Sequence, residues 1–321
     1  MKTLPLKLSN AIDRELAPLN MDKLKAACAD LTQRYAQGQF IDNQLHRQAY
    51  IAARLPATYG VLQDVFRRIE PFLKPVKSLL DLGAGVGSLA WAAHETIANL
   101  ERVTLFEKDV EFLRLGQHLT QENLHPLQLA WCRHDITKED IFPSHDAVVL
   151  SYVLNELSLN EQAHVLEKAY EAADNLLILI EPGTPESFGH ILKARQLLTN
   201  LGANIIAPCS HNASCPLAPR FIEGKDWCHF SVRIPRGKYH TRAKDAALPY
   251  EDEKYSYLAV SPHPISEPKA RVIKAPIRKT GHVILDLCMQ NTELERRIIS
   301  KSNEKIYPKA RDIDWGDEWN W

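Results

Sequence analysis

Between residues 78 and 200 the chain alternates short apolar runs with longer amphipathic stretches. Each apolar run has the length of a buried strand, and the amphipathic stretches have the length of helices. Strands that alternate with helices are typical of a parallel sheet covered on both faces. The pattern predicts an α/β fold with a doubly wound, Rossmann-like sheet. Its expected strands are 78–83, 102–107, 127–132, 147–153 and 175–183, and its expected helices are 88–98, 109–121, 160–172 and 185–200.

The alternation is missing from both ends of the chain. The N-terminal part shows helical apolar spacing at Leu24, Leu31 and Tyr35, and we expect Pro56 to mark a break between two helices. After Leu201, two apolar runs are expected to complete the sheet, and further β-type runs predict a β-rich tail. We divide the chain into an N-terminal helical cap (1–72), a sheet domain (73–265) with a cysteine loop (207–230), and a C-terminal extension (266–321).

The composition is that of a globular protein. Of the 321 residues, 45% are hydrophobic and 25% are charged. The longest apolar runs, such as 176–180, are far shorter than the roughly 20 residues that a bilayer requires. The first 16 residues lack the features of a secretory signal. We therefore expect a cytoplasmic protein without a membrane partner, monomeric when free, whose cysteines are free thiols or metal ligands.

Positive charge is concentrated in two stretches near the end of the sheet domain and in the tail. Residues 233–244 and 269–279 each carry five Lys or Arg residues and no acidic residue. Such clusters suit contact with nucleic-acid phosphates, because each cation displaces condensed counterions. The alternative is a solvated basic surface.

A glycine-rich turn follows the first predicted strand of the sheet. Asp81, Gly83, Gly85 and Gly87 form an acid-x-G-x-G-x-G pattern, and Ser88 stands where a dinucleotide-binding fingerprint requires its third glycine. The pattern is similar to motif I of class I S-adenosylmethionine-dependent methyltransferases.

Three further residues fit the same cofactor. Glu107 ends the second strand, where a carboxylate would accept hydrogen bonds from the ribose hydroxyls. Asp135 follows the third strand, beside the expected adenine position, and Ser151 ends the fourth. Together with the glycine turn, these residues predict an S-adenosylmethionine site.

The catalytic side of the predicted site is less distinctive. Many enzymes that methylate a base nitrogen carry N/D-P-P-Y/F after the fourth strand, but this chain has Ser-Tyr-Val-Leu-Asn-Glu at 151–156. Tyr152, Asn155 and Glu156 are candidates for contact with a methyl acceptor, or they pack and cap the next helix. Cys132, at the end of the third strand, is expected to be a buried apolar cysteine and not a nucleophile.

Four cysteines in the last third of the chain form a candidate metal site: Cys209, Cys215, Cys228 and Cys288. The first three lie in a loop rich in polar residues and proline. Their spacing matches neither the paired C-x2-C of common zinc sites nor the C-x2-C-x2-C of ferredoxins. Thiolates suit both zinc and iron–sulfur clusters, so both remain open, as do four unrelated thiols. His211 and His229 are alternative ligands, or hydrogen-bond partners.

The sequence resembles the methyltransferase-like family of small-ribosomal-subunit proteins, known from the mitochondrial small subunit and with bacterial relatives. The resemblance covers nearly the whole chain. It rests on AYIAARLPATYGVL (49–62), LLDLGAGVGSLAWAA (79–93), VLSYVLNELS (149–158), DWCHFSVR (226–233), EKYSYL (253–258), GHVILDLC (281–288) and YPKARDIDWGDEW (307–319).

The resemblance implies a class I methyltransferase domain and a [4Fe–4S] cluster held by Cys209, Cys215, Cys228 and Cys288. It also implies a role in small-subunit assembly through contact with ribosomal RNA or the pre-ribosomal small subunit. Three functions follow as hypotheses: an RNA methyltransferase, a non-catalytic assembly factor, or a small-molecule methyltransferase with a structural zinc. From the expected topology, the cysteine loop should lie at the sheet edge opposite the cofactor and clasp the tail to the sheet domain.

Overall fold

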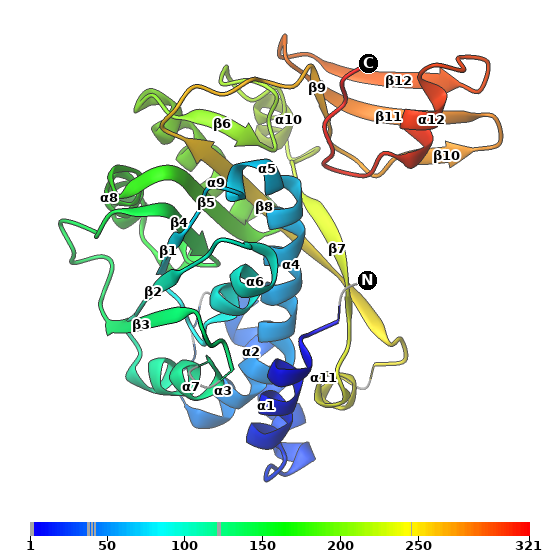
Figure 1. The fold of residues 1–321 in the computed structure, drawn as a ribbon. Coiled ribbons are helices and arrows are strands. Elements are labelled where there is room, and N and C mark those ends of the chain that lie inside the picture. Colours follow the sequence, from blue (N-terminus) through cyan, green and yellow to red (C-terminus); the bar gives the residue numbers. More distant parts are fainter. Residues whose placement is uncertain (1–2, 37–38, 40, 42, 121–122, 245) are drawn as a thin grey trace.

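The central element is a mixed sheet. The computed structural model describes residues 3–36, 39, 41, 43–120, 123–244 and 246–321. Within them, eight strands form one sheet in the order β3-β2-β1-β4-β5-β8-β6, and β7 pairs with β8 (Figure 1). The strands are β1 (Ser78–Leu82), β2 (Arg102–Glu107), β3 (Gln128–Arg133), β4 (His145–Ser151), β5 (Ala173–Pro182), β6 (Asn204–Ala207), β7 (Phe230–Pro235) and β8 (Tyr250–Ser261).

The pairing directions define the fold class. Strands β1 to β5 are parallel, β8 is antiparallel to β5, and β6 and β7 are antiparallel to β8. An antiparallel strand between the fifth and sixth strands is characteristic of the class I methyltransferase sheet. The predicted doubly wound α/β fold is confirmed.

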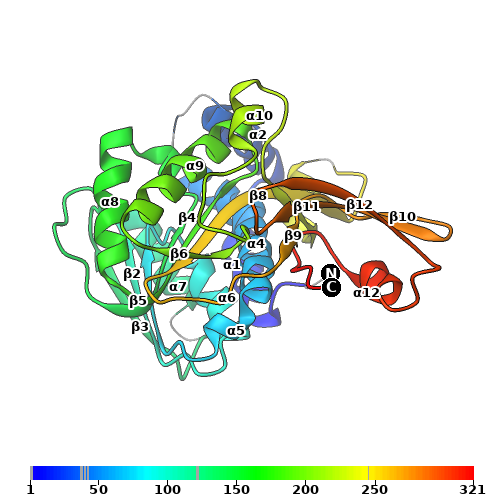
Figure 2. The ribbon, with the colours of Figure 1, turned by 90° about the horizontal axis from the view of Figure 1, so that it is seen from above.

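Helices cover both faces of the sheet, because its central strands are apolar on both sides. All five residues of β1 are buried. Leu79 packs in a core with α4 and α6, whereas Leu80 packs in a second core with α8 and α9. Figure 2 shows α8 and α9 together, with α4 and α6 across the sheet from them. The sheet helices are α6 (Ser88–Thr96), α7 (Val110–Thr120), α8 (Leu159–Glu171) and α9 (Pro185–Asn200).

These helices lie where the sequence pattern predicts them, and their first turns explain why. Ser158 and Glu161 form a reciprocal capping box at the start of α8. Thr184 caps α9, and Pro185 occupies its first turn, where a missing backbone N–H costs nothing. The boundaries are therefore set by local sequence.

The N-terminal part is helical, as expected, but Pro56 does not separate two helices. Residues 44–68 form one continuous helical path, in which a π-helical segment at 50–54 joins α3 to α4. Proline removes one backbone donor and crowds the preceding turn, and the wider π segment directly before Pro56 accommodates it. This part comprises α1 (Leu6–Leu16), α2 (Met21–Ala36), α3 (Gln44–Ala49), η1 (Tyr50–Arg54), α4 (Leu55–Arg68) and α5 (Glu70–Leu73).

The C-terminal extension is a second, four-stranded sheet within the described residues, ordered β10-β11-β12 with β9 beside β11. It stands apart from the main sheet at the upper right of Figure 1. One face packs on α12 around Leu285, Ile299 and Trp319. Its elements are β9 (Ala270–Val272), β10 (Ile277–Lys279), β11 (His282–Met289), β12 (Leu294–Ser300) and α12 (Tyr307–Asp312). The predicted β-rich tail is confirmed.

No helix in the described part of the chain is long and apolar enough to cross a membrane.

Candidate functional site

The turn after β1 has the backbone that its glycines allow. Gly83, Gly85 and Gly87 have φ values of 82°, 55° and 81°, in the left-handed region that favours glycine. At Gly83 a Cβ atom would also lie 2.6 Å from Cγ2 of Val153. The turn leads directly into α6, whose first backbone N–H groups have no partner within the helix. The glycine pattern therefore forms a tight left-handed turn at the start of α6, and its role in cofactor binding stays a prediction.

Two carboxyl groups predicted for the cofactor lie at this turn. Glu107 accepts hydrogen bonds from the backbone N–H groups of Gly85 and Asp109, both at 2.8 Å. Asp81 is 1% exposed, and neither of its carboxyl oxygens has a hydrogen-bond partner within the described residues. Burial, and next the charge of Glu107, raise the pKa of Asp81 well above its usual range. A buried carboxyl group without a partner is costly, so this position suits a ligand donor.

Asp135 and Ser151 lie at the ends of β3 and β4, at the same sheet edge. The carboxylate of Asp135 already accepts hydrogen bonds from the hydroxyl and the N–H of Thr137, at 2.8 and 3.2 Å, and pairs with Lys138 at 3.3 Å. The Thr137 hydroxyl contributes most to lowering the pKa of Asp135. Asp135 is therefore satisfied without a ligand, in contrast to Asp81.

Tyr152 follows β4 in a strained conformation. Its φ is 62°, and its buried hydroxyl group has no partner among the described residues. Non-glycine residues adopt this region rarely, and often at functional sites. The strain is maintained by Glu181, whose carboxyl group accepts hydrogen bonds from the N–H groups of Val153 and Leu154 at 3.0 and 2.7 Å.

The other two candidates for contact with a methyl acceptor, Asn155 and Glu156, have partners elsewhere in the chain. The side-chain amide of Asn155 donates to the hydroxyl of Ser187 on α9, at 2.9 Å. Glu156 lies 3.9 Å from Lys108, and burial raises the pKa of its carboxyl group to about 7. One third of the Glu156 side chain is still exposed, so it borders both the site and solvent.

Sequence reasoning missed two residues of this site, Glu181 and Tyr50. Tyr50 begins the π-helical segment, and its hydroxyl lies 3.7 Å from the place that a Cβ of Gly85 would occupy. The N-terminal helices thereby form a wall of the glycine turn. No local sequence pattern pointed to either residue.

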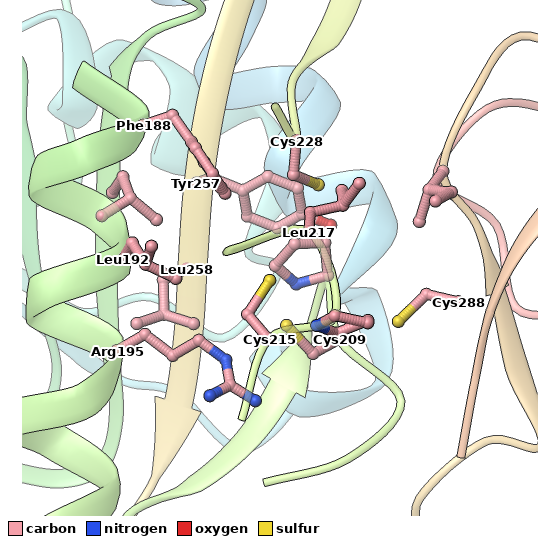
Figure 3. A pocket seen from close by; sticks show the side chains of 14 residues that line it. Phe188, Leu192, Arg195, Cys209, Cys215, Leu217, Cys228, Tyr257, Leu258 and Cys288 are labelled. Atoms are coloured by element: carbon pink, nitrogen blue, oxygen red, sulfur yellow. The ribbon is translucent and has the colours of Figure 1, made fainter. Parts of the chain in front are cut away.

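The four predicted metal ligands lie around one cavity. Cys209, Cys215, Cys228 and Cys288 all line it, together with Arg195 and apolar side chains. Figure 3 shows the thiols directed toward a common space, with Cys288 entering from the side of the tail. The cavity volume is about 30 Å³.

Burial and neighbouring thiols raise the pKa values of three of these cysteines, which favours their neutral form. Burial, and next the proximity of Cys209, raise the pKa of Cys215 to about 11 and that of Cys288 to about 12. The pKa of Cys228 is raised well above its usual range for the same reasons. Thiols in this setting are inert unless a metal replaces their protons.

The two histidines proposed as alternative ligands behave differently. Nε2 of His211 lies 3.6 Å from the sulfur of Cys288, and its Nδ1 lies 3.2 Å from the carbonyl oxygen of Ala213. His229 instead packs against Trp227 and Trp315. Neither histidine lines the cavity in the described structure.

Among the described residues, no group of three or more His, Cys, Asp or Glu side chains has an arrangement that could hold one metal ion. The thiols thus share a cavity without converging on a single point. The cavity lining, in the described part of the chain, contains no carboxylate, and four thiols suit a soft metal or an iron–sulfur cluster. The iron–sulfur and zinc assignments stay predictions.

The expected position of the cysteine loop was wrong in one respect. Strand β6 runs parallel to β5, so the loop after Ala207 leaves the same carboxyl edge that carries the glycine turn. Along this edge, β4, β5 and β8 lie between β1 and β6. Four strand spacings amount to roughly 19 Å. The two sites therefore share an edge but are separate along it.

The first basic stretch does not present free positive charge as its composition indicated. Four of its five basic residues form ion pairs: Arg233 with Asp252, Arg236 and Lys244 with Glu251, and Lys238 with Asp13. The partners lie on β8 and α1, outside the stretch itself. Most of the positive charge of this stretch is therefore neutralised by carboxylates of the same chain.

The second basic stretch attaches the tail. Arg271 is 1% exposed and donates to the carbonyl oxygens of Ile206, at 2.9 Å, and Gly316, at 3.4 Å. Lys274 pairs with Asp226 at 2.6 Å. Lys279, at the tip of the tail, is exposed.

Comparison with known proteins decides the family. Residues 44–320 match the family described as "Mitochondrial small ribosomal subunit Rsm22". The chain belongs to the Rsm22 family. This confirms the family resemblance expected from the sequence segments.

Two relatives of this Rsm22-family chain illustrate its place. Rsm22-cox11 tandem protein 2 of Schizosaccharomyces pombe is 26% identical over 97% of this chain and 47% of that protein. The human ribosome assembly protein METTL17 is 24% identical over 84% of this chain and 61% of that protein. The chain thus spans about half the length of the curated relatives it matches. Both relatives are named as mitochondrial, which contradicts the expected cytoplasmic location.

Solved structures resemble the Rsm22-family chain only distantly. The magnesium protoporphyrin IX methyltransferase of Synechocystis, with S-adenosylmethionine bound, is 16% identical over 72% of this chain and 90% of that chain, with a TM-score of 0.42. A likeness at this level carries no conclusion about substrate.

Proposed function

We propose that this chain is a small-ribosomal-subunit assembly protein of the mitochondrial type. In this proposal it binds subunit RNA, keeps an S-adenosylmethionine site, and holds a metal centre that ties its tail to the sheet domain. The family supports the ribosomal role. The observation that carries the metal centre is the set of four thiols, drawn from distant segments, around one cavity at the junction with the tail.

RNA contact is assigned to the tail and not to the two basic stretches as wholes. Within residues 266–321, four exposed lysines form neither an ion pair nor a side-chain hydrogen bond with the described residues: Lys279, Lys301, Lys305 and Lys309. Exposed cations without carboxylate partners are the groups best able to contact phosphates.

The metal centre is proposed to use Cys209, Cys215, Cys228 and Cys288, as either a [4Fe–4S] cluster or a zinc ion. Bound metal would stabilise thiolates that are otherwise protonated, and so would contribute folding free energy at the junction.

Metal analysis separates these two versions of the centre. Protein purified without oxygen is expected to contain close to four iron and four sulfide per chain, because a [4Fe–4S] cluster has that composition. One zinc per chain without sulfide would identify a zinc site instead. Protein without stoichiometric iron or zinc, which also takes up neither on reconstitution, would contradict the metal centre.

The cofactor site is proposed to hold S-adenosylmethionine, whose sulfonium supplies an electrophilic methyl group when bound. Asp81 has unpaired carboxyl oxygens for a cationic amino group, and Glu107 has remaining lone pairs for ribose hydroxyls. Gly83, Gly85 and Gly87 let the backbone approach the ligand closely. These residues bind and orient the cofactor whether or not a methyl group is transferred.

Asp81→Asn is expected to weaken S-adenosylmethionine binding by about 10- to 100-fold, the range for loss of a charge-assisted hydrogen bond. The variant should be at least as stable as the unmodified protein, because the buried acidic group has no partner to lose. Calorimetric titration and thermal melting measure the two effects. Asp135→Asn is the matched control and should weaken binding less, since Thr137 and Lys138 already satisfy that carboxylate. Equal affinity in the Asp81 variant would contradict its role.

Methyl transfer to RNA is the second candidate function, and strained Tyr152 with its unpaired hydroxyl favours it. Immature small subunits incubated with methyl-labelled cofactor test it directly. Label in the RNA that disappears with Tyr152→Phe would support an enzyme. Cofactor binding without incorporation would favour the non-catalytic assembly factor.

A further inference from the structure

Arg195 is the one charged side chain that lines the cysteine cavity in the described part of the chain. It lies on α9 and is only 4% exposed. Figure 3 shows its side chain reaching from the helix toward the loop that carries Cys209 and Cys215. A buried guanidinium group is costly unless hydrogen bonds and opposite charge compensate it.

The hydrogen bonds of Arg195 fix the loop between two predicted ligands. Nη2 donates to the carbonyl oxygens of His211, at 3.0 Å, and Ala213, at 2.5 Å. Both carbonyls lie between Cys209 and Cys215 in the sequence. The two N–H groups of this one nitrogen bond both carbonyls at once. A lysine ammonium ends one bond nearer the backbone, so it cannot reach both carbonyls from the same helix position.

The charge of Arg195 is not compensated by a carboxylate. No ion pair of Arg195 occurs within the described residues, and its buried Nε has no hydrogen-bond partner there. The groups lining the same cavity that can become negative are its thiols. When a metal replaces their protons, the thiolates supply the missing counter-charge.

We propose that Arg195 is a positioning residue of the metal centre, which orders the Cys209–Cys215 loop and offsets the negative charge of the metal-bound thiolates. This inference rests on the proposed metal centre. It assigns to Arg195 a role in the retention and redox potential of that centre, in addition to a role in folding.

The test compares three variants of the full chain, each loaded without oxygen. Arg195→Gln removes the charge and the double contact. Arg195→Lys keeps the charge but ends one bond short of Nη2 and so loses the double contact. Lys193→Gln, an exposed position on the same helix, removes one charge away from the cavity. Iron and zinc content, the rate of metal loss to a chelator, and the midpoint potential of bound iron are measured.

Arg195→Gln is expected to lose metal roughly tenfold faster or more, the usual effect of removing an outer support of a metal site. The midpoint potential of its remaining cluster should shift to a more negative value, because the reduced cluster carries one more negative charge and has lost the nearby cation that stabilised it. Arg195→Lys should lose metal faster but keep a potential close to that of the unmodified protein. Lys193→Gln should match the unmodified protein in the rate of metal loss and in the midpoint potential.

The outcomes distinguish failure of this inference from failure of the metal centre. If unmodified protein takes up metal and Arg195→Gln equals it in retention and potential, the role of Arg195 is overturned while the centre stands. If the centre holds zinc, only metal retention can be measured. Unchanged retention in both Arg195 variants would then overturn the role of Arg195. If unmodified protein takes up neither metal, both proposals fail. Should Arg195→Gln not fold, the retention of Arg195→Lys decides.

Discussion

Cys288→Ser is expected to abolish stoichiometric metal binding and to loosen the tail from the sheet domain. Cys288 is buried on β11, and the other three predicted ligands belong to the sheet domain. The carbonyl of Cys288 also accepts a hydrogen bond from the hydroxyl of Ser210, at 2.8 Å. Serine preserves the backbone and this contact, so the change removes mainly the thiolate.

The expected effect on stability is large. Structural zinc sites contribute about 10–16 kcal/mol of binding free energy near neutral pH. If only about 3 kcal/mol of that reaches the folded state here, the Tm falls by roughly 6–12 °C. Hydrogen exchange should increase in β9–β12 and less in β1–β5, because the tail loses one of its attachments. Thermal melting and hydrogen-exchange mass spectrometry measure the two effects.

Cys132→Ser is the matched control, since Cys132 lies outside the cavity on β3. It should leave metal content and tail exchange unchanged. Loss of metal in Cys288→Ser without faster exchange in the tail would refute the clasp but leave the metal centre intact. Arg271, Lys274 and the hydrogen bond from Ser210 would then maintain the attachment without the metal.

The parts of the fold that follow from local sequence were predictable. The glycine spacing at 83–87 requires left-handed backbone, and the caps at Ser158 and Thr184 set two helix starts. The prediction failed where a short strand was overlooked. β6 has only four residues, and its presence carries the chain back to the carboxyl edge before the cysteine loop begins. One missed strand therefore placed the loop at the wrong edge.

The candidate site was predictable only for residues that lie at the carboxyl end of a predicted strand. Asp81, Glu107 and Ser151 end neighbouring parallel strands, so their approach is a consequence of topology. Tyr50 reaches the site from a helix outside the sheet, and no local pattern encodes that contact. The charge of the first basic stretch was misjudged because Glu251 and Asp252 lie on the paired strand β8. Composition cannot reveal such partners.

Glu181→Gln is expected to stabilise the protein increasingly as pH rises. Glu181 is fully buried at the end of β5, and burial raises the pKa of its carboxyl group to about 8. An unfolded glutamate loses its proton near pH 4.3, whereas the folded one keeps it to about pH 8. Between these values the folded state binds more protons, so the stability of the unmodified protein falls by about 1.4 kcal/mol per pH unit from this group.

Glutamine at position 181 removes that dependence while keeping the local contacts. Its carbonyl oxygen can accept the same hydrogen bonds from Val153 and Leu154. Its amide NH2 group occupies the position of Oε2, the oxygen that carries the proton in the neutral acid. Oε2 has no hydrogen-bond partner in the described structure, so this exchange breaks no hydrogen bond. The two proteins should therefore be about equally stable near pH 4, and the variant should be more stable by about 3–5 kcal/mol at pH 9.

Urea denaturation of both proteins from pH 4 to pH 9 measures this difference. Glu304→Gln, an exposed position in the tail without an ion pair there, is the control and should show no comparable trend. One outcome is that the free energies of unfolding of Glu181→Gln and the unmodified protein differ by a constant amount across this pH range. That result would show that Glu181 has the same pKa in the folded and unfolded chain. A rising difference would mean that near neutral pH a protonated Glu181 holds the strained Tyr152 segment in place, since the same carboxyl group binds its two following N–H groups.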